Sequence, residues 1–351
     1  MTLMWVKPVY AIYDPLSVPN NKYGIHILEP SEVEKAKEFV NSGGGEWGYV
    51  TIPIRANDRN LEKWTEFMVK SRQYKVIPIL RIASFPVDDH WMAPNDYDLL
   101  DFANFLDQLP WPTKNRYIIV YNEPNHAGEW GGYVYPEEYA RILNRAVDIF
   151  RQLNGDFFII AAGLDSSQTN IYSYFKTMKD TVPEIFNKVD GLSFHTYGNP
   201  AFATPPNVYS KVNIGSYRYE LRYLTQLGVD RNKPIFLTET GWKNPADWYF
   251  EYAFNQVWVE ENIVAVTPFL LNGGEGPFKE FNFIDNHTEF KGFAKKIIAL
   301  TKVPGRPLIS ELKESKPNKF IQINSLIPTS SPVSEQNIFE KLYELLRLIF
   351  G

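Results

Sequence analysis

Short apolar runs alternate with longer amphipathic segments along most of the chain, and this alternation constrains the fold more than any other feature. Eight runs, bounded by Gly, Pro, Asn or Asp, recur at a mean spacing of about 35 residues, the length that one strand, one helix and their loops require. Most of them are apolar throughout, as in strands buried on both faces of a parallel sheet. The predicted strands are 23–28, 49–54, 76–80, 117–121, 157–161, 191–194, 235–238 and 265–270.

The segments between these runs have the apolar spacing of amphipathic helices. A strand followed by a helix, repeated eight times, predicts an α/β fold in which the strands close into a (β/α)8 TIM barrel over residues 1–310. The predicted helices are 31–41, 61–73, 97–109, 136–153, 171–188, 216–227, 247–262 and 289–300.

An open, doubly wound sheet is the alternative fold. Its nucleotide-binding members carry G-x-G-x-x-G or G-x-x-x-x-G-K-[ST] after a strand, and neither motif follows any predicted strand of this chain. The sequence therefore favours the barrel. Its first strand is ambiguous, because residues 9–13 are also apolar and would form either a hairpin on the barrel floor or strand one itself.

The pattern changes after about Leu308, and residues 311–351 are predicted to extend the barrel with a linker and a helix. Residues 327–334, rich in Pro and Ser, are typical of a linker, and residues 338–350 repeat apolar side chains at helical spacing. We expect this amphipathic helix to pack on the barrel or to mediate self-association. Membrane attachment is disfavoured, because the polar face carries as much Glu as Lys and Arg.

Composition excludes several classes of protein. With 44% hydrophobic and 22% charged residues the chain is globular, and a net charge of −5 without basic runs argues against a nucleic-acid partner. The chain has no Cys, which rules out disulfides, thiolate nucleophiles and Cys-ligated metals. No apolar run is long enough to cross a bilayer, and no targeting segment is visible, so the location of the protein stays open.

In a barrel, polar side chains that end different strands meet at one mouth. Two carboxylates deserve most weight, because Glu123 and Glu239 each end an apolar strand, where an ionised group is costly unless it has a task. They end the fourth and seventh strands, so their carboxyl groups can approach each other. The polar and aromatic residues at the strand ends are His26, Arg55, Arg81, Asn122, Glu123, Asp165, His195, Tyr197, Glu239, Trp242 and Asn272.

A pair of carboxyl groups across a sugar-sized gap is the arrangement that glycoside cleavage needs. One protonated carboxyl donates to the leaving oxygen, and one ionised carboxylate attacks or stabilises the anomeric carbon. Asn122-Glu123-Pro124, His195-Thr196-Tyr197 and Thr238-Glu239, at the ends of the fourth, sixth and seventh strands, resemble the signature of glycoside hydrolase clan A. This barrel superfamily includes cellulases, mannanases, xylosidases and galactanases, and the resemblance covers residues 22 to 300.

The resemblance implies a retaining hydrolase of β-linked glycans with a role for each matching residue. Glu123 would be the acid/base, and Glu239 would be the nucleophile. Asn122 would bind the sugar 2-hydroxyl. Tyr197 would donate to the nucleophile, and His195 would contact the sugar or orient the acid/base. The partner would be an oligo- or polysaccharide, and a polysaccharide substrate would favour a secreted or cell-surface protein.

Further candidates for substrate binding are two arginines and several aromatic residues. Arg55 and Arg81 end the second and third strands, where clan members often place an Arg that supports the nucleophile, and the sequence does not choose between them. Trp130 and Trp242 lie in loops at the mouth, where their rings could stack on sugars. The eighth strand lacks the Trp that many clan members place under the sugar, so Trp242, Phe269 or polar contacts would replace it.

Two other functions are compatible with a barrel. One is a glycan-binding barrel that does not cleave its ligand. The other is a metal-dependent hydrolase with His26, His195 and Asp165 as ligands, but it is disfavoured because the chain holds only five His and no H-x-H ends the first strand. The sequence thus predicts neither a metal nor a cofactor.

Overall fold

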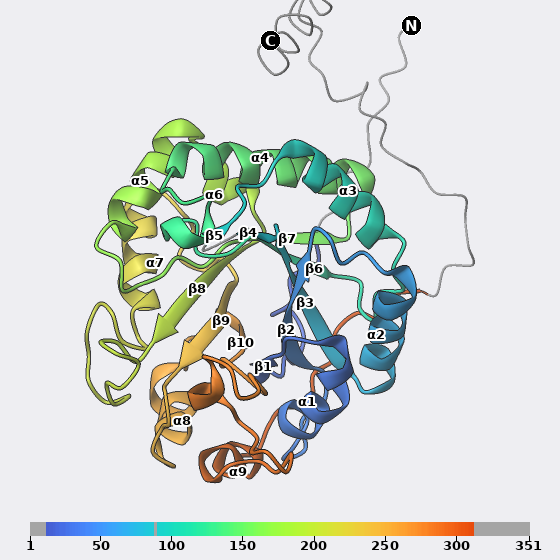
Figure 1. Ribbon diagram of the computed structural model, residues 1–351, viewed down its shortest axis with the longest axis vertical. Helices are drawn as coiled ribbons and strands as arrows, with labels where there is room; N and C mark the ends of the chain where they lie inside the picture. The colour runs from blue at the N-terminus through green and yellow to red at the C-terminus, as the bar shows by residue number, and fades with distance from the viewer. Residues whose placement is uncertain (1–11, 88–89, 312–351) are drawn as a thin grey trace, which may run out of the picture. The chain divides into compact units, whose positions relative to one another are not determined.

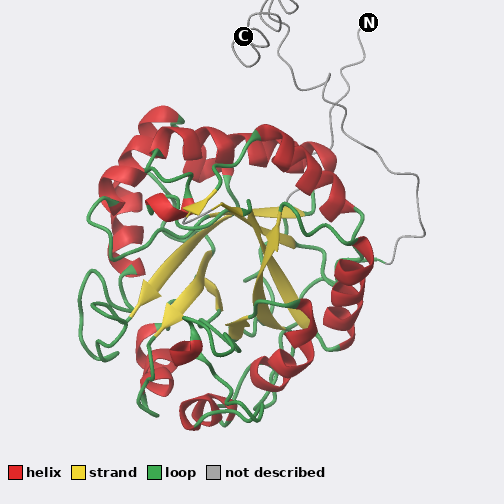
Figure 2. Ribbon diagram, viewed as in Figure 1, coloured by secondary structure: helices red, strands yellow, loops and turns green. Residues whose placement is uncertain are grey.

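The computed structural model describes residues 12–87 and 90–311, and in this part of the chain eight parallel strands form one sheet. Figures 1 and 2 show the helices around the strands. The strands neighbour one another in the order β1-β2-β3-β6-β7-β8-β9-β10, and a parallel bridge between Tyr23 and Val266 joins the first strand to the last. The predicted (β/α)8 barrel is confirmed. Its strands are β1 (Gly24–His26), β2 (Gly48–Arg55), β3 (Val76–Ala83), β6 (Arg116–Val120), β7 (Phe157–Ala161), β8 (Gly191–Tyr197), β9 (Ile235–Gly241) and β10 (Ile263–Val266).

Local sequence explains where the helices begin and end. Asn60 and Asn95 cap α2 and α3 by accepting hydrogen bonds from backbone N–H groups three residues on, and Pro136 stands at the first position of α4. The helices are α1 (Val33–Val40), α2 (Leu61–Gln73), α3 (Asp96–Asp107), α4 (Pro136–Leu153), α5 (Ile171–Thr181), α6 (Ile185–Lys188), α7 (Tyr217–Gln226), α8 (Tyr249–Tyr252) and α9 (Gly292–Ile298).

Two predicted helices are wrong in extent. The single helix expected over 171–188 is broken into α5 and α6, because Pro183 lacks an N–H and disfavours helical backbone at the residue before it. The helix expected over 247–262 is reduced to α8 and one π-helical turn, Ala253–Val257.

The eighth strand also differs from expectation, since β10 ends at Val266 and not at residue 270. Residues after Val266 still close the barrel through backbone hydrogen bonds. The backbone N–H of Phe269 donates to Thr240 O at 2.9 Å, and His26 N–H donates to Pro268 O at 2.9 Å. Pro268 interrupts the regular ladder because it has no N–H to donate. The consequence is that Phe269 lies between the ends of β9 and β1.

The barrel interior changes in character from floor to mouth. Near the floor, Tyr49, Tyr117, Phe158 and Phe236 pack ring against ring, with centroids 5.0–6.1 Å apart. Above them comes a layer of hydroxyls, where Thr51 and Thr267 are hydrogen-bonded at 2.8 Å and Ser193 contacts Thr238. Ionisable side chains follow at the carboxyl ends of the strands. Layered filling of this kind makes the lower barrel a packed core and leaves the chemistry to the mouth.

A short hairpin, β4 (Pro86–Val87) with β5 (His90–Trp91), lies in the loop after β3 and was not predicted. The N–H of Gly131 donates to Trp91 O at 2.7 Å, so this hairpin is tied to the loop that follows β6. Together the two loops build one wall of the mouth above β3 and β6.

The remaining predictions concern the chain ends. Strand one of the barrel is β1, and residues 12 and 13 belong to no helix or strand; residues 9–11 lie outside the described part. The predicted linker and amphipathic helix of the 311–351 extension lie outside it too, from residue 312 on. Among the residues that the structure describes, no helix has the length and hydrophobicity of a membrane span.

Candidate active site

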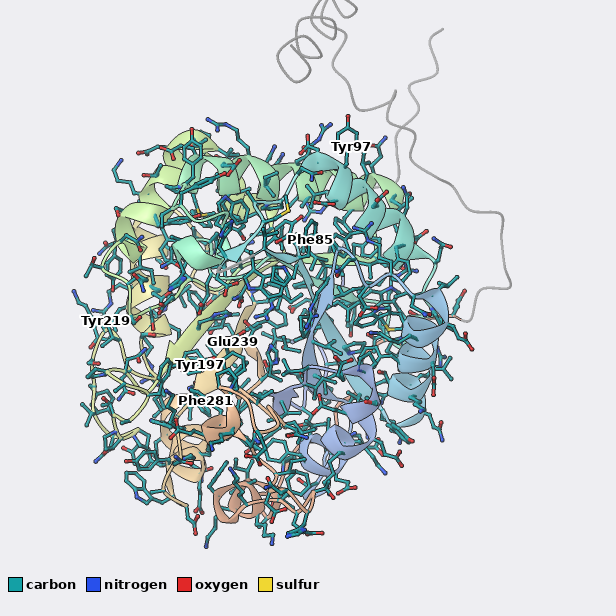
Figure 3. The ribbon with its side chains drawn as sticks, viewed as in Figure 1. Phe85, Tyr97, Tyr197, Tyr219, Glu239 and Phe281 are labelled. Atoms are coloured by element: carbon teal, nitrogen blue, oxygen red, sulfur yellow. The ribbon has the colours of Figure 1, made fainter. Side chains whose placement is uncertain are left out.

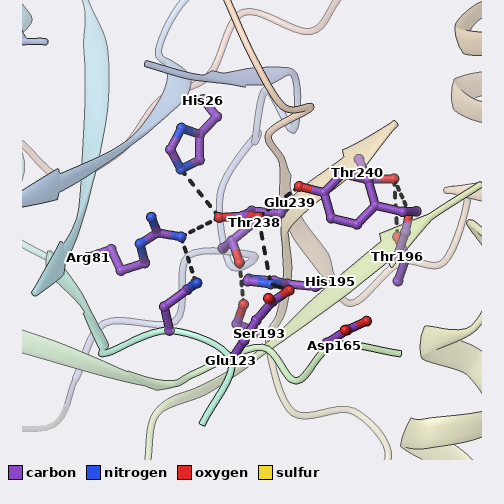
Figure 4. A network of polar contacts seen from close by, with 12 residues as sticks. His26, Arg81, Glu123, Asp165, Ser193, His195, Thr196, Thr238, Glu239 and Thr240 are labelled. Carbon is purple, nitrogen blue, oxygen red and sulfur yellow. Dashed lines mark hydrogen bonds and ion pairs between the residues drawn. The ribbon is translucent and has the colours of Figure 1, made fainter. Parts of the chain in front are cut away.

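Glu239 is held at the mouth by three neighbours from three different strands, of which Figure 4 labels His26 and Arg81. It lies within β9, beside a register shift between Phe194 and His195 that pairs His195 with Glu239 on adjacent strands. Arg81 of β3 contacts Glu239 Oε1 through Nη1, and the Tyr197 hydroxyl donates to Glu239 Oε2 at 2.7 Å. His26 Nε2 lies 3.6 Å from Oε1.

These neighbours keep Glu239 ionised. Burial alone would raise the pKa of this carboxyl, since only 9% of the side chain is exposed. The positive charges of His195 and Arg81 and the hydrogen bond from Tyr197 outweigh burial and hold its pKa well below the usual range. An ionised carboxylate is the form that a nucleophile needs.

Glu123 has a different environment. It follows β6 with a backbone φ of 31°, in the left-handed region that non-glycine residues rarely adopt. Its Oε1 lies 2.7 Å from His195 Nδ1. Burial raises the pKa of Glu123, and the nearby charges of Glu239 and Asp165 raise it further against the opposing effect of His195. A carboxyl that stays protonated at higher pH is suited to donate a proton.

The loop backbone that carries Glu123 is fixed by the neighbouring loop. Asn125 Nδ2 donates to Asp165 O at 3.1 Å, and Asp165 N–H donates back to Asn125 Oδ1 at 2.9 Å. This reciprocal pair joins the loops after β6 and β7. The unusual backbone at Glu123 is therefore supported by two strands' connections and not by its own loop alone.

The two glutamates face each other across His195. One carboxylate oxygen of Glu123, one of Glu239 and a ring nitrogen of His195 all lie within 4.8 Å of one another. Burial lowers the pKa of His195, but the adjacent carboxylates more than offset it, and the net shift is upward. Two carboxyls this close can act on the same sugar, one on the anomeric carbon and the other on its leaving oxygen.

Gly163 makes the position of His195 sterically feasible. A Cβ at residue 163 would stand 2.2 Å from His195 Cδ2, closer than any packing allows. The loop after β7 thus needs glycine here so that the imidazole can turn toward Glu123. No pattern in the sequence predicted this requirement.

Arg81, and not Arg55, reaches the site. Arg81 Nη1 donates to Asn122 Oδ1 at 2.6 Å as well as contacting Glu239, so it joins two of the predicted site residues. Arg55 is exposed at the end of β2. Register explains the difference in depth: Arg81 pairs with Pro53, whereas Arg55 pairs with Ala83, two residues nearer the rim.

The two predicted tryptophans do not line the mouth. Trp130 has no exposed surface, and its indole N–H donates to Glu138 Oε2 at 2.7 Å. Trp242 is 1% exposed, and its N–H donates to Thr204 O at 2.6 Å. Both rings are parts of the packing between loops and barrel, so neither presents a face to a ligand.

The aromatic rings nearest Glu239 are mostly buried as well, with Tyr197 and Phe269 each 8% exposed. Phe269 packs edge-on against His26 at 5.2 Å between centroids and lies 6.3 Å from Tyr197. Figure 3 shows Tyr197 and Glu239 where β8 and β9 end, with Phe281 beside Tyr197 at 5.9 Å. Phe278, 44% exposed, contacts Phe269 at 5.2 Å and continues this aromatic surface outward.

Sequence reasoning undervalued His26 and missed Glu129. His26 is fully buried beside Glu239. Glu129 lies in the loop after β6, where burial raises its pKa against the charge of Arg81 and a hydrogen bond with Asn122. A third carboxyl therefore borders the same arginine. The only signal was its place in a glycine-rich loop that follows the fourth strand.

Glu123, His195 and Glu239 also form a group whose spacing could hold a metal ion. Its three ligand atoms are close enough, but Arg81 already places a positive charge on Glu239, and His195 Nδ1 is engaged with Glu123. A divalent cation would have to displace both contacts. The donor set does not fit a metal well, and the ligands expected for a metal hydrolase, His26, His195 and Asp165, do not form such a group among the described residues.

Solved structures of several glycan-cleaving barrels resemble this chain in fold. No family model matches the sequence, and no curated protein does. A β-xylosidase from Caulobacter crescentus aligns with a TM-score of 0.60 at 12% identity, over 80% of this chain and 68% of its own.

Two further solved structures align with this chain over most of their own length. The mannanase catalytic domain from Streptomyces sp. SirexAA-E aligns with a TM-score of 0.53 at 12% identity, over 85% of this chain and 92% of its own. A fungal β-1,4-galactanase aligns with a TM-score of 0.54 at 13% identity, over 80% and 99%. The expected resemblance to clan A glycoside hydrolases is thus confirmed at the level of the fold.

Proposed function

We propose that this protein is a retaining glycoside hydrolase that cleaves β-linked glycans by double displacement, with Glu239 as nucleophile and Glu123 as acid/base. One observation carries the proposal: two carboxyls with oxygens within 4.8 Å have pKa values displaced in opposite directions. Such displaced pairs mark acid and nucleophile roles, and a short separation is typical of retention, whereas inversion needs room for a water between the carboxyls.

In the first step, Glu239 Oε attacks the anomeric carbon while the Glu123 carboxyl gives its proton to the leaving oxygen, and the glycosidic bond breaks. In the second step, Glu123, now ionised, takes a proton from water, whose oxygen attacks the same carbon and releases Glu239. Arg81 and Tyr197 hold Glu239 for attack, and Asn122 binds the sugar 2-hydroxyl. His195 orients Glu123 through its 2.7 Å contact.

The aromatic rings around the mouth support a sugar ligand. Phe278, 44% exposed and packed on Phe269, offers flat apolar surface on the side of the carboxyls, and sugars stack their C–H faces on such surfaces. Phe269, at the place of the tryptophan that the eighth strand carries in many clan members, is only 8% exposed, so polar contacts would hold the sugar there. If the substrate is a polysaccharide, we expect the protein to work outside the cell or at its surface.

Covalent trapping tests the proposal. The protein is incubated with activated 2-deoxy-2-fluoro β-glycosides of glucose, mannose, xylose and galactose, and its intact mass is measured. We expect one of them to add a single glycosyl unit, mapped by peptide digestion to Glu239, and the Glu239→Gln variant to stay unmodified. Oligosaccharide binding without an adduct or new reducing ends on any of the four sugars would contradict the proposal and favour the non-cleaving glycan-binding barrel.

A further inference from the structure

Large apolar side chains stay exposed on the wall of the mouth that the loops after β3 and β6 build. Phe85 and Met92 come from the first loop, and Tyr133 and Tyr135 come from the second; each is between 36% and 45% exposed. The two tyrosine rings are 6.3 Å apart between centroids. The proposed mechanism uses none of these four residues, which we call the ridge.

Contacts between the two loops make the ridge one surface. The N–H of Met92 donates to Phe85 O at 3.1 Å, which sets these two residues side by side. Gly131 links them to the second loop, because its N–H donates to Trp91 O at 2.7 Å. A Cβ at residue 131 would stand only 3.1 Å from the Tyr133 ring, so this ring lies directly beside the junction of the loops.

The backbone under the ridge is fixed before any ligand arrives. Ser84 Oγ donates to Met92 O at 2.6 Å in the first loop. In the second loop Trp130 is fully buried, and its indole N–H donates to Glu138 Oε2 of α4 at 2.7 Å. A ligand that stacks on the exposed rings therefore pays little for ordering the loops.

The ridge lies on the side of the mouth from which the leaving group departs. Tyr133 and Tyr135 belong to the loop that carries Glu123, and in the proposed mechanism Glu123 gives its proton to the leaving oxygen. The sugar that Glu239 attacks lies between the two carboxyls. The units beyond the cleaved bond consequently extend over the loop of Glu123 and not over the opposite wall.

Phe85 lies above the layer of the carboxyls. It follows Arg81, which contacts Glu239, by four residues, and four residues span at most about 13 Å of extended chain. Figure 3 shows Phe85 inside the ring of helices, whereas Tyr97 lies at the outer edge of the molecule. The ridge thus reaches sugar units outside the one at the nucleophile.

The opposite wall exposes less aromatic surface. Phe269 and Phe281 pack edge to face, 5.5 Å apart between centroids, and both are buried. Phe278 is the exposed member of this group. A glycan that stacks on aromatic rings therefore gains more contact area from units over the ridge than from units over the opposite wall.

From this asymmetry we propose that the ridge binds two or more sugar units on the leaving-group side, so that the substrates are glycan chains and not glycosides of small alcohols. Rings from two loops offer more than one stacking face, which suits more than one unit. The tyrosine hydroxyls add polar groups at the ring edges, where sugar hydroxyls lie. The inference rests on the proposed function, because it needs a bond cleaved between Glu123 and Glu239.

Chain length and the position of the cleaved bond test it. The substrates are β-linked oligosaccharides of two to six units of the sugar that traps the protein, and its 4-nitrophenyl glycoside, whose leaving group carries no sugar. For each enzyme the ratio of kcat/KM between the fastest oligosaccharide and the aryl glycoside is measured, and this ratio does not depend on the folded fraction. In ¹⁸O-labelled water the label enters the new reducing end, so mass spectrometry identifies the unlabelled fragment as the leaving one.

The variants remove or keep the rings. Phe85→Ala and the double variant Tyr133→Ala/Tyr135→Ala remove ring faces, and Tyr133→Phe/Tyr135→Phe keeps them. Tyr97→Ala is the control, because Tyr97 is an exposed ring away from the mouth. We expect wild type to release unlabelled fragments of two or more units, and the alanine double variant to lose about 10-fold in the ratio, the order expected for the apolar area of one aromatic side chain.

The phenylalanine double variant should keep most of the ratio, and the Tyr97 control should keep all of it. An unchanged ratio in the alanine variants overturns the inference and leaves the glycosidase intact. So does a gain with chain length that comes from units in the labelled fragment. A wild-type protein that neither forms new reducing ends nor is trapped overturns both proposals.

Discussion

The two glutamates of the mouth belong to regions built in different ways. Glu239 lies within a strand, and Arg81 and Tyr197, which contact it, also lie within strands. Glu123 lies in a loop with unusual backbone, and its hydrogen-bond partner is His195. The first region fixes a charge, because its contacts are rigid and cationic or proton-donating. The second keeps a proton that can be given up and regained. The same amino acid thus acquires opposite properties from its surroundings.

Removing the charge of Glu239 should lower the activity more than any other change. Glu239→Gln keeps the shape of the side chain but cannot form the covalent intermediate, so we expect kcat/KM to fall by at least about 10⁴-fold, the order reached when one member of a catalytic unit is removed. Initial rates with aryl glycosides measure this. Substantial residual activity that azide does not change would assign the nucleophile elsewhere.

Changing the loop region should give a loss that depends on the substrate. Glu123→Ala removes the proton donor, and we expect natural glycans to lose about 10²–10⁴-fold in kcat. Substrates with good leaving groups need no proton in the first step, so they should lose much less. Added azide should accelerate them, because a small anion can attack the intermediate without a general base. Equal losses for poor and good leaving groups would remove Glu123 from the acid/base role.

Replacing Arg81 should bring the pKa values of Glu239 and Glu123 closer together. Its charge is one of the causes that hold the pKa of Glu239 down, so Arg81→Met should raise that pKa. Activity needs Glu239 ionised, and the acidic limb of the pH profile should therefore move to higher pH. We expect kcat/KM at the optimum to fall about 10²–10³-fold, as for the loss of one preorganised donor. Arg55→Met is the matched control and should leave both the rate and the limb unchanged.

Tyr197 should have a smaller effect of the same sign. Tyr197→Phe removes the 2.7 Å hydrogen bond to Glu239 Oε2 but leaves the charge of Arg81 in place. A hydrogen bond to a charged group stabilises it by about 1.5–3 kcal/mol, so we expect a loss of about 10–100-fold in kcat/KM and a smaller upward shift of the acidic limb. A pH profile identical to wild type would show that Tyr197 does not set the charge of Glu239.

The barrel and the approach of Glu123 to Glu239 follow from patterns along single strands, because a residue that ends a parallel strand reaches the mouth whatever its neighbours are. How deep a side chain lies within the mouth does not follow from such patterns. Arg55 and Arg81 both lie near strand ends, and only the pairing of β2 with β3 puts Arg81 one layer lower. His26 is likewise defined by residues far away in the chain, Glu239 and Phe269.

Tryptophan was the least predictable residue, because its ring serves ligand binding and core packing equally well. The loop after β9 contains one buried and one exposed tryptophan. Trp242 is 1% exposed, and its ring packs against Phe250 at 4.9 Å, whereas Trp248 is 44% exposed. Which ring is buried depends on the helix and loops that pack over it. No local sequence pattern predicts that packing.

Trp242 therefore gives the smallest expected effect on activity and a clear effect on stability. Trp242→Phe removes the hydrogen bond to Thr204 O and leaves a gap beside Phe250, so we expect the free energy of unfolding to fall by about 1–3 kcal/mol, measured by urea denaturation. KM for oligosaccharides should stay within about twofold, because the ring presents no face to the mouth. Trp248→Phe, a change at an exposed ring, should alter stability by less than about 0.5 kcal/mol. A raised KM with unchanged stability in Trp242→Phe would mean that the covered region, too, takes part in holding the glycan.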